Sequence, residues 1–138
     1  MKKIKEKKKI GFTCGAFDLT HAGHYLMFKE CKEQCDLLFV GLQTDPSIDR
    51  KEKNKPVQSI DERYIQLASC KYINGIVIYE TEKDLYDLLQ LMKIDVRFLG
   101  ADHKGKPFTG DDLKIKVVFN SRNHNYSTSS LRERVKKI

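Results

Sequence analysis

Short apolar runs alternate with helical patterns along almost the whole chain, and this alternation limits the possible folds more than any other feature. Strand-like runs occupy residues 9–17, 36–44, 75–79, 94–100 and 113–120, and helical patterns occupy residues 22–35, 59–70, 82–93 and 127–138. Each parallel strand has to be reached by a crossover, and helical crossovers cover both faces of the sheet. We therefore predict an α/β chain with a three-layer Rossmann-like fold, in which helices flank a five-stranded parallel sheet.

The length and composition indicate one globular unit. A chain of 138 residues most simply forms a single core. We predict a basic N-terminal arm over residues 1–8 and one domain over residues 9–138. No apolar run approaches the roughly 18 residues that a membrane-spanning helix needs. The arm also lacks the apolar stretch of a secretory signal, so we expect a cytoplasmic protein without a membrane partner.

The formal net charge of +7 comes largely from the opening "MKKIKEKKK". We interpret this run as a solvated arm, and therefore expect no nucleic-acid partner. A tail attracted to RNA or lipid is the alternative, which would make the chain a non-catalytic nucleic-acid or anion-binding module. The four cysteines lack the paired spacing of a zinc site, so we expect reduced, mostly buried thiols.

In a parallel sheet of this kind, ligands bind beyond the carboxyl ends of the strands, where the strand order reverses. This rule selects four segments that follow strand-like runs. They are "GAFDLTHAGH" (15–24), the lysine-bearing loop 45–58, "GADHKGKPFTG" (100–110) and "SRNHNYSTSS" (121–130).

The first of these segments has the pattern of an anion site. His21 and His24 are three residues apart at a predicted helix start, so both imidazoles project from one side. Unpaired backbone N–H groups and the helix dipole favour anions there, and Gly15 lets a ligand approach the backbone. The segment therefore predicts a polyphosphate site. Two alternatives remain open: histidines that only cap the helix, and a zinc site completed by His103 and His124.

The residue identities in this segment are more specific than the spacing of its two histidines. "GAFDLTHAGH" resembles the H-x-G-H signature of the nucleotidyltransferase superfamily, and its combination with "DERYIQL" and "YSTSSL" is similar to the cytidylyltransferase family. The closest resemblance is to the glycerol-3-phosphate cytidylyltransferases. It extends from Lys9 to Ile138 with the motifs in the same order.

The resemblance implies a set of site residues. His21, His24, Arg63 and Arg122 correspond to the catalytic positions of that family, the two histidines acting on the transition state. The implied nucleotide-binding residues are Gly15, Ala16, Phe17, His21, His24, Gly100, Asp102, Arg122, Tyr126, Ser127, Thr128 and Ser129. The implied residues for the acceptor or its phosphate are Lys51, Lys53, Lys55, Arg63 and Lys106.

Two segments depart from the family pattern. Asn125 and Tyr126 replace the glycine and isoleucine before the S-T-T motif, and Ser129 replaces its second threonine, which affects base selection. "GADHKGK" lacks the first aspartate and the tryptophan of the corresponding family motif, which affects the acceptor.

The function that the resemblance implies is transfer of CMP from CTP to a small phosphorylated alcohol. Glycerol 3-phosphate is the expected acceptor, giving CDP-glycerol and pyrophosphate. Mg²⁺ is expected as cofactor, held mainly by the triphosphate, and a homodimer is expected. An adenylyltransferase that uses ATP and a sugar phosphate is the alternative, because the H-x-G-H turn is shared with that branch.

Overall fold

A computed structural model describes residues 7–138, so most of the predicted N-terminal arm lies outside the described residues. The elements are β1 (Ile10–Gly15), α1 (Ala22–Lys32), β2 (Leu37–Gln43), α2 (Ile60–Ala68), β3 (Gly75–Tyr79), α3 (Glu82–Leu91), β4 (Val96–Leu99), the 3-10 turn η1 (Ala101–His103), β5 (Lys116–Phe119) and α4 (Thr128–Lys136). The predicted alternation of strands and helices is confirmed. No helix within residues 7–138 is long and apolar enough to span a membrane.

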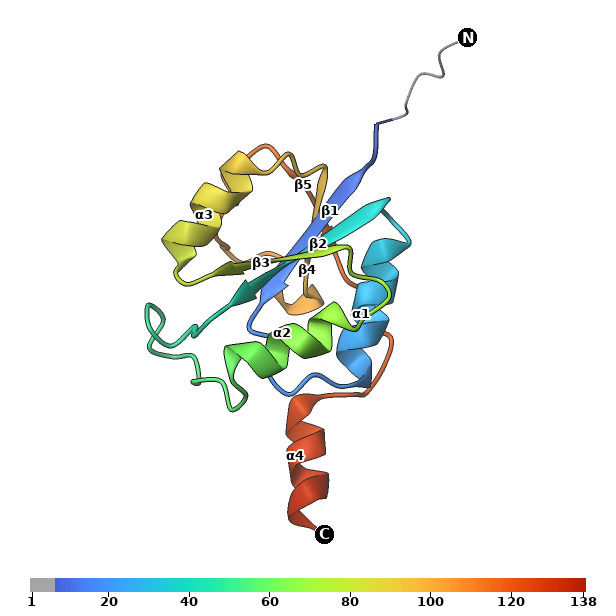
Figure 1. The fold of residues 1–138 in the computed structure, drawn as a ribbon, viewed down its shortest axis with the longest axis vertical. Coiled ribbons are helices and arrows are strands. Elements are labelled where there is room, and N and C mark those ends of the chain that lie inside the picture. The colour runs from blue at the N-terminus through green and yellow to red at the C-terminus, as the bar shows by residue number, and fades with distance from the viewer. Residues whose placement is uncertain (1–6) are drawn as a thin grey trace.

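The five strands form one parallel sheet in the order β3-β2-β1-β4-β5. Helices α1 and α2 cover one face, and α3 covers the other (Figure 1). The first face is closed by a core that includes Phe28, Leu67 and Phe98, and the second by a core that includes Phe12 and Leu89. The Rossmann-like three-layer prediction is therefore correct.

The central strand β1 is aligned by two carboxylates, one on each side of it. Asp36 precedes β2 and accepts a hydrogen bond from the backbone N–H of Lys9 at 2.6 Å. Asp95 precedes β4 and accepts one from the N–H of Ile10 at 2.8 Å. Because a register slip of one residue would exchange the two faces of a strand, these bonds help to fix which side chains reach each core.

The reversal of strand order lies between β1 and β4. The chain runs outward from β1 through β2 to β3, then returns to place β4 on the other side of β1. Crossovers leave these two strands in opposite directions, which opens a crevice at their carboxyl ends. The segment 16–21 and the turn η1 therefore face each other across the crevice.

Helix α4 differs from the other helices because none of its residues is buried. It extends away from the body of the domain (Figure 1). Its N-terminal end lies near the crevice, since Ser127 and Thr128 line the same cavity as His21 and His24. All four cysteines are free, with Cys31 buried and the other three half-buried.

Two leucines on α3 provide a test of the core. Leu89 is 2% exposed, whereas Leu91 on the same helix is 82% exposed. We expect Leu89→Ala to lower the free energy of unfolding by about 2–5 kcal/mol, because it removes buried methyl groups and leaves a cavity. Leu91→Ala should change it by less than about 0.5 kcal/mol. Urea unfolding followed by circular dichroism measures both, and equal effects would contradict the assigned faces of α3.

Candidate functional site

The start of α1 is capped by two histidines instead of the usual serine and glutamate. The Nδ1 atom of His21 accepts a hydrogen bond from the N–H of Gly23 at 3.0 Å. The Nδ1 atom of His24 accepts one from the N–H of His21 at 3.1 Å. An Nδ1 that accepts a hydrogen bond carries no proton, so each neutral ring has its proton on Nε2. The cap therefore leaves both Nε2–H groups as donors for a ligand.

The glycine between these histidines allows a third imidazole to approach. A Cβ atom at Gly23 would lie 2.7 Å from Cε1 of His124 and 2.8 Å from Cε1 of His21. The ring of His124 in turn stacks on Tyr126, with centroids 5.4 Å apart. The loop after β5 can therefore lie against the start of α1 only because this position has no side chain.

Both capping histidines are held neutral. Burial lowers the pKa of His24 to about 4, and the charges of His21 and His124 act in the same direction. Burial also lowers the pKa of His21, with further contributions from His124 and Arg122. Near neutral pH the site therefore presents neutral N–H donors, and the positive charge in the cavity that they line comes from Arg122 and Lys29.

The turn between β1 and α1 is held from the α2 side by the carboxylate of Asp18. This carboxylate accepts hydrogen bonds from the N–H groups of Val57 at 2.8 Å and Gln58 at 2.9 Å. The N–H of Leu19 donates a hydrogen bond to the side-chain oxygen of Gln58 at 2.7 Å. Phe17 and Leu19 have positive φ angles, 48° and 51°, which cost free energy outside glycine. These bonds stabilise the backbone conformation that brings His21 to the crevice.

Arg63 lies in a place that the resemblance did not imply. It is 2% exposed and lines neither of the two main cavities. Its guanidinium donates to the carbonyls of Ala16, Gln43, Thr44, Gln58 and Ser59. With these bonds made, Arg63 positions the ends of β1 and β2 in this structure. Direct contact between Arg63 and a phosphate stays a prediction.

Most of the predicted nucleotide residues line one cavity of about 810 Å³ over the start of α1. These are His21, His24, Gly100, Asp102, Arg122, Tyr126, Ser127 and Thr128. The Ser127 hydroxyl caps α4 by accepting from the N–H of Ser130 at 3.1 Å. Phe17 packs behind the site, with its ring 6.2 Å from that of His24. Ser129 is exposed in the first turn of α4.

A second cavity of about 680 Å³ lies at the carboxyl ends of the strands on the α3 side. It is lined by the predicted residues Gly15, Ala16, Gly100 and Lys53. Lys51, Lys55 and Lys106 are exposed and line neither cavity, so their contact with an acceptor stays a prediction.

Several lining residues were not predicted from the sequence. The first cavity also contains Lys29 of α1 and Asn120 directly after β5, and the second contains Arg97. Arg50, which also lines the second cavity, belongs to the cationic loop 45–58 that the sequence singled out. Arg97 is a charged residue in the otherwise apolar strand "VRFL", and this is a signal that the sequence carried. Lys29 has no such signal, because a lysine on an amphipathic helix is ordinary.

The fold and the paired histidines at a helix N-terminus define the class of α/β nucleotide-binding transferases. The chain belongs to the cytidylyltransferase-like family, whose model matches residues 12–134. It is therefore a nucleotidyltransferase.

The similarity to curated proteins is to one part of larger chains. The chain is 36% identical over 130 residues to the bifunctional protein HldE of Campylobacter jejuni, covering 94% of this chain and 28% of HldE. It is 37% identical over 133 residues to HldE of Campylobacter concisus, covering 96% and 28%. The chain thus spans less than a third of the length of these relatives.

Solved structures show the same fold. The lipopolysaccharide core biosynthesis protein of Thermoplasma volcanium superposes with a TM-score of 0.70 at 24% identity, covering 88% of this chain and 100% of that one. The pantoate-β-alanine ligase of Francisella tularensis superposes with a TM-score of 0.55 at 16% identity, covering 98% and 72%.

The histidine cap predicts a pH-dependent stability. The pKa of His24 is about 4 in the folded chain and about 6.5 in an unfolded one, so the folded state binds fewer protons between these values. This contribution is fully present above pH 6.5 and is lost as the pH falls toward 4. We expect the free energy of unfolding to fall by up to about 3 kcal/mol across this window from His24 alone.

His24→Asn should flatten this dependence, whereas His103→Asn on the exposed turn η1 should leave it unchanged. Urea unfolding at pH 7, 5.5 and 4.5 compares the three proteins. Native carboxylates such as Asp95 have a lowered pKa and titrate mainly below this window, so the difference between variants isolates the imidazole. Parallel curves for the native protein and His24→Asn would contradict the assignment.

Proposed function

We propose that the chain is an adenylyltransferase that transfers AMP from ATP to the phosphate of a sugar phosphate. The observation that carries this proposal is the histidine cap, which presents two Nε2–H donors beside a cavity of about 810 Å³ at a helix N-terminus. The choice of ATP is supported by the similarity to HldE. Tyr126 lines the same cavity and offers an exposed aromatic face to a base.

Transfer of CMP from CTP to glycerol 3-phosphate is the second candidate. It is favoured by "YSTSSL" after β5, where Ser127 caps a helix as a phosphate-binding hydroxyl motif would. It is weakened at Asn125 and Tyr126, where the pattern of that family has other residues.

In the proposed reaction, an oxygen of the acceptor phosphate forms a bond to the α-phosphorus of the triphosphate. The bond from that phosphorus to the oxygen bridging the β-phosphate breaks, and its electron pair leaves with pyrophosphate. The acceptor phosphate is anionic at neutral pH, so no general base is needed. Catalysis then depends on positioning and on hydrogen bonds to the charged oxygens.

His21 and His24 supply these hydrogen bonds from their Nε2–H groups. Their rings lie close together, with centroids 4.2 Å apart, so both can reach oxygens of one phosphoryl group. Arg122 adds a positive charge in the same cavity. Because the backbone bonds to Nδ1 fix both rings before a ligand arrives, little reorganisation is needed during the reaction.

We propose that Mg²⁺ enters with the triphosphate. Protein-bound Mg²⁺ commonly uses one or two carboxylates together with substrate phosphates. Asp102 offers such a carboxylate, because it lines the first cavity and its side chain is largely exposed. The residues present therefore fit a metal carried by the nucleotide. Its chemistry is to neutralise charge on the departing pyrophosphate.

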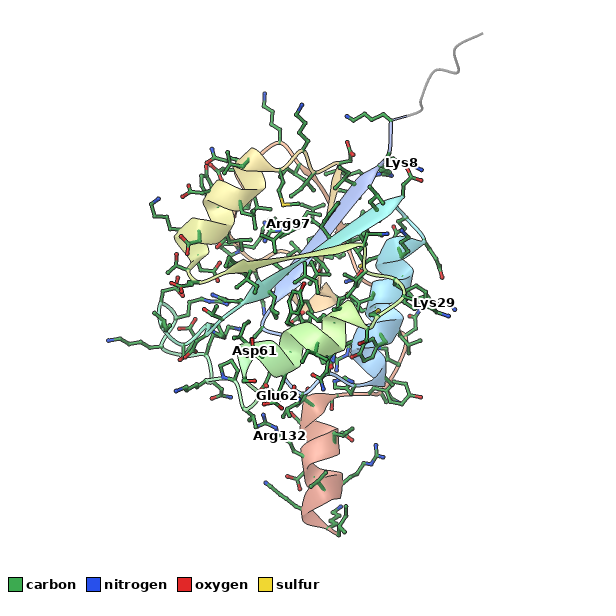
Figure 2. All side chains as sticks on the ribbon, in the orientation of Figure 1. Lys8, Lys29, Asp61, Glu62, Arg97 and Arg132 are labelled. Carbon is green, nitrogen blue, oxygen red and sulfur yellow. The ribbon has the colours of Figure 1, made fainter. Side chains whose placement is uncertain are left out.

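We also propose that the chain forms a homodimer through α4 and α2 of a second copy. Helix α4 carries the exposed apolar residues Leu131 and Val135 one turn apart. Helix α2 exposes Tyr64 and Ile65. Most of the remaining charges on the two helices are complementary, the exception being Glu133 of α4, which lies 3.5 Å from the Lys136 ammonium. Arg132, Arg134, Lys136 and Lys137 lie on or directly after α4, whereas Asp61 and Glu62 begin α2 (Figure 2).

The first test is a screen of triphosphates against acceptors. Purified protein with Mg²⁺ is incubated with ATP or CTP and with sugar 1-phosphates, sugar 6-phosphates or glycerol 3-phosphate, and pyrophosphate release is measured. We expect turnover with ATP and a sugar phosphate. Turnover only with CTP would contradict the adenylyl proposal and support the second candidate.

The same assay tests the histidines. His21→Ala and His24→Ala should each lower kcat by about 10²–10³, as removal of a single transition-state donor does elsewhere. Lys93→Ala, at an exposed residue after α3 that lines neither cavity, should leave kcat unchanged. Deletion of residues 1–6 should also have little effect. A nucleic-acid-binding module would behave in the opposite way, with salt-sensitive RNA binding that depends on the arm and survives His21→Ala.

The homodimer is tested by sedimentation equilibrium. We expect the native chain to have twice the 16.1 kDa of one copy. Val135→Asp on α4 should give monomers, because it places a charge in the proposed contact. Leu91→Asp, which changes a still more exposed residue of α3, should remain dimeric. A monomeric native chain, or a dimeric Val135→Asp variant, would contradict the proposal.

A further inference from the structure

The second cavity lies outside the arrangement around His21 and His24, although Gly15, Ala16 and Gly100 line it. Its volume is about 680 Å³, and it is separated from the first cavity by the sheet. The first cavity opens over α1, whereas the second is bordered by the start of α3 and the segment after η1. Both cavities are lined by Gly100 at the end of β4. A molecule in one cavity can therefore meet a molecule in the other at this residue.

The second cavity contains a buried arginine. Arg97 is in the middle of β4 and is 3% exposed. Its side chain lies between the sheet and α3 (Figure 2). Its Nη1 donates to the carbonyl of Thr109, and its Cζ lies 5.2 Å from the centroid of the Phe108 ring. Its Nη2 is 4.0 Å from Sγ of Cys14, a weak acceptor.

The guanidinium of Arg97 is incompletely satisfied. Its Nε is buried and has no hydrogen-bond partner among the described residues. Within residues 7–138, no carboxylate forms an ion pair with it. Arginine cannot lose its proton at physiological pH, and burial of an unpaired charge is strongly unfavourable. The buried and unpaired guanidinium of Arg97 therefore favours the binding of an anion from outside the chain.

The other charged groups of the cavity leave this positive charge uncompensated. Glu82 already pairs with Nε of Arg50 at 2.9 Å and accepts from the hydroxyl of Thr109 at 3.0 Å. Asp111 accepts from the N–H of Phe108 at 3.3 Å. Lys53 and Arg50 add further cationic side chains to the lining. The cavity therefore suits a ligand with an acid group and several hydroxyls.

We propose that the second cavity is the acceptor site and that Arg97 binds an acid group of the acceptor there. This proposal rests on the proposed function, because it assigns the second substrate of the same reaction. Nucleotide and acceptor then approach from opposite faces of the sheet and meet beside Gly100. Thr109 and the half-buried carboxylate of Glu82 line the same cavity and are positioned to contact sugar hydroxyls.

The decisive variant is Arg97→Lys, which keeps the charge and removes the planar guanidinium. We expect the KM for the acceptor to rise about 10- to 100-fold, in line with the loss of charge-assisted hydrogen bonds. The KM for the triphosphate should change less than about twofold. Lys114→Arg, at an exposed residue before β5 that lines neither cavity, is the control and should change neither constant. An unchanged KM for the acceptor would overturn the proposal.

The acid group that Arg97 binds is identified by comparing two kinds of acceptor. One kind has a single phosphate, such as glucose 1-phosphate, and the other has a carboxylate besides its phosphate, such as 3-phosphoglycerate. A rise of KM for every acceptor means that Arg97 binds the reacting phosphate. A rise only for acceptors with a second acid means that it binds that acid. Both results support the assignment of the cavity.

A binding measurement separates this proposal from the proposed function. With a non-hydrolysable ATP or CTP analogue occupying the first cavity, inorganic phosphate is titrated calorimetrically into the native chain and Arg97→Lys. We expect weaker binding to the variant by at least tenfold, whether or not any pair of substrates turns over. Equal binding would overturn the proposal.

Because a buried arginine can be needed for folding, the thermal midpoint of each variant is measured first. If Arg97→Lys does not fold, Arg50→Gln is used, since Arg50 lines the same cavity and is partly exposed. It should raise the KM for the acceptor several-fold and leave the KM for the triphosphate unchanged. A change confined to the triphosphate would contradict the assignment of this cavity.

Discussion

The guanidinium of Arg63 holds together three chain segments on which the rest of the site depends. It donates to carbonyls at the end of β1, at the end of β2 and at the start of α2. Ala16 and Gln58 lie outside the strands and helices, so one side chain satisfies carbonyls there that would otherwise need water. These hydrogen bonds from Arg63 also fix the distance between the turn after β1 and the start of α2. Asp18 can then accept from the N–H groups of Val57 and Gln58.

A rigid turn is needed because the helix cap that follows it is also the candidate catalytic group. Serine or aspartate would cap α1 more simply, as Ser59 and Thr81 do for α2 and α3. Histidine at both cap positions uses the same bonds to orient Nε2 toward the cavity. The helix start and the reactive geometry are thus one structure. A change that loosens the turn would disturb both the start of α1 and the orientation of the histidines. Because both depend on this turn, the strained backbone at Phe17 and Leu19 is tolerated.

The sequence predicted the fold and the first cavity because both depend on local patterns. Strand and helix periodicity located the five strands and the four α-helices, but not the 3-10 turn η1. The second cavity depends instead on which elements the sheet brings together, and Arg97 and Thr109 are neighbours only through the return of the chain after β4. Arg63 was predicted as a site residue, but its burial follows from carbonyls on three separate elements. The choice of nucleotide depends on the side chains around the base. One motif there, "NYSTSS", differs from the pattern of the expected family.

Arg63 and Arg97 show why burial of a charge is not by itself a sign of function. Both are nearly inaccessible, Arg63 on α2 and Arg97 in β4. Arg63 donates to five carbonyls, so its charge is dispersed over the backbone and an added anion would have to displace bonds already made. Arg97 has one carbonyl, one thiol and an aromatic face, which leave donors unused. The number of hydrogen bonds that each guanidinium already makes thus distinguishes the two residues. Arg63 stabilises the fold, whereas Arg97 has donors left for the proposed ligand. This difference also accounts for the position of each, since Arg63 lines no main cavity and Arg97 faces one.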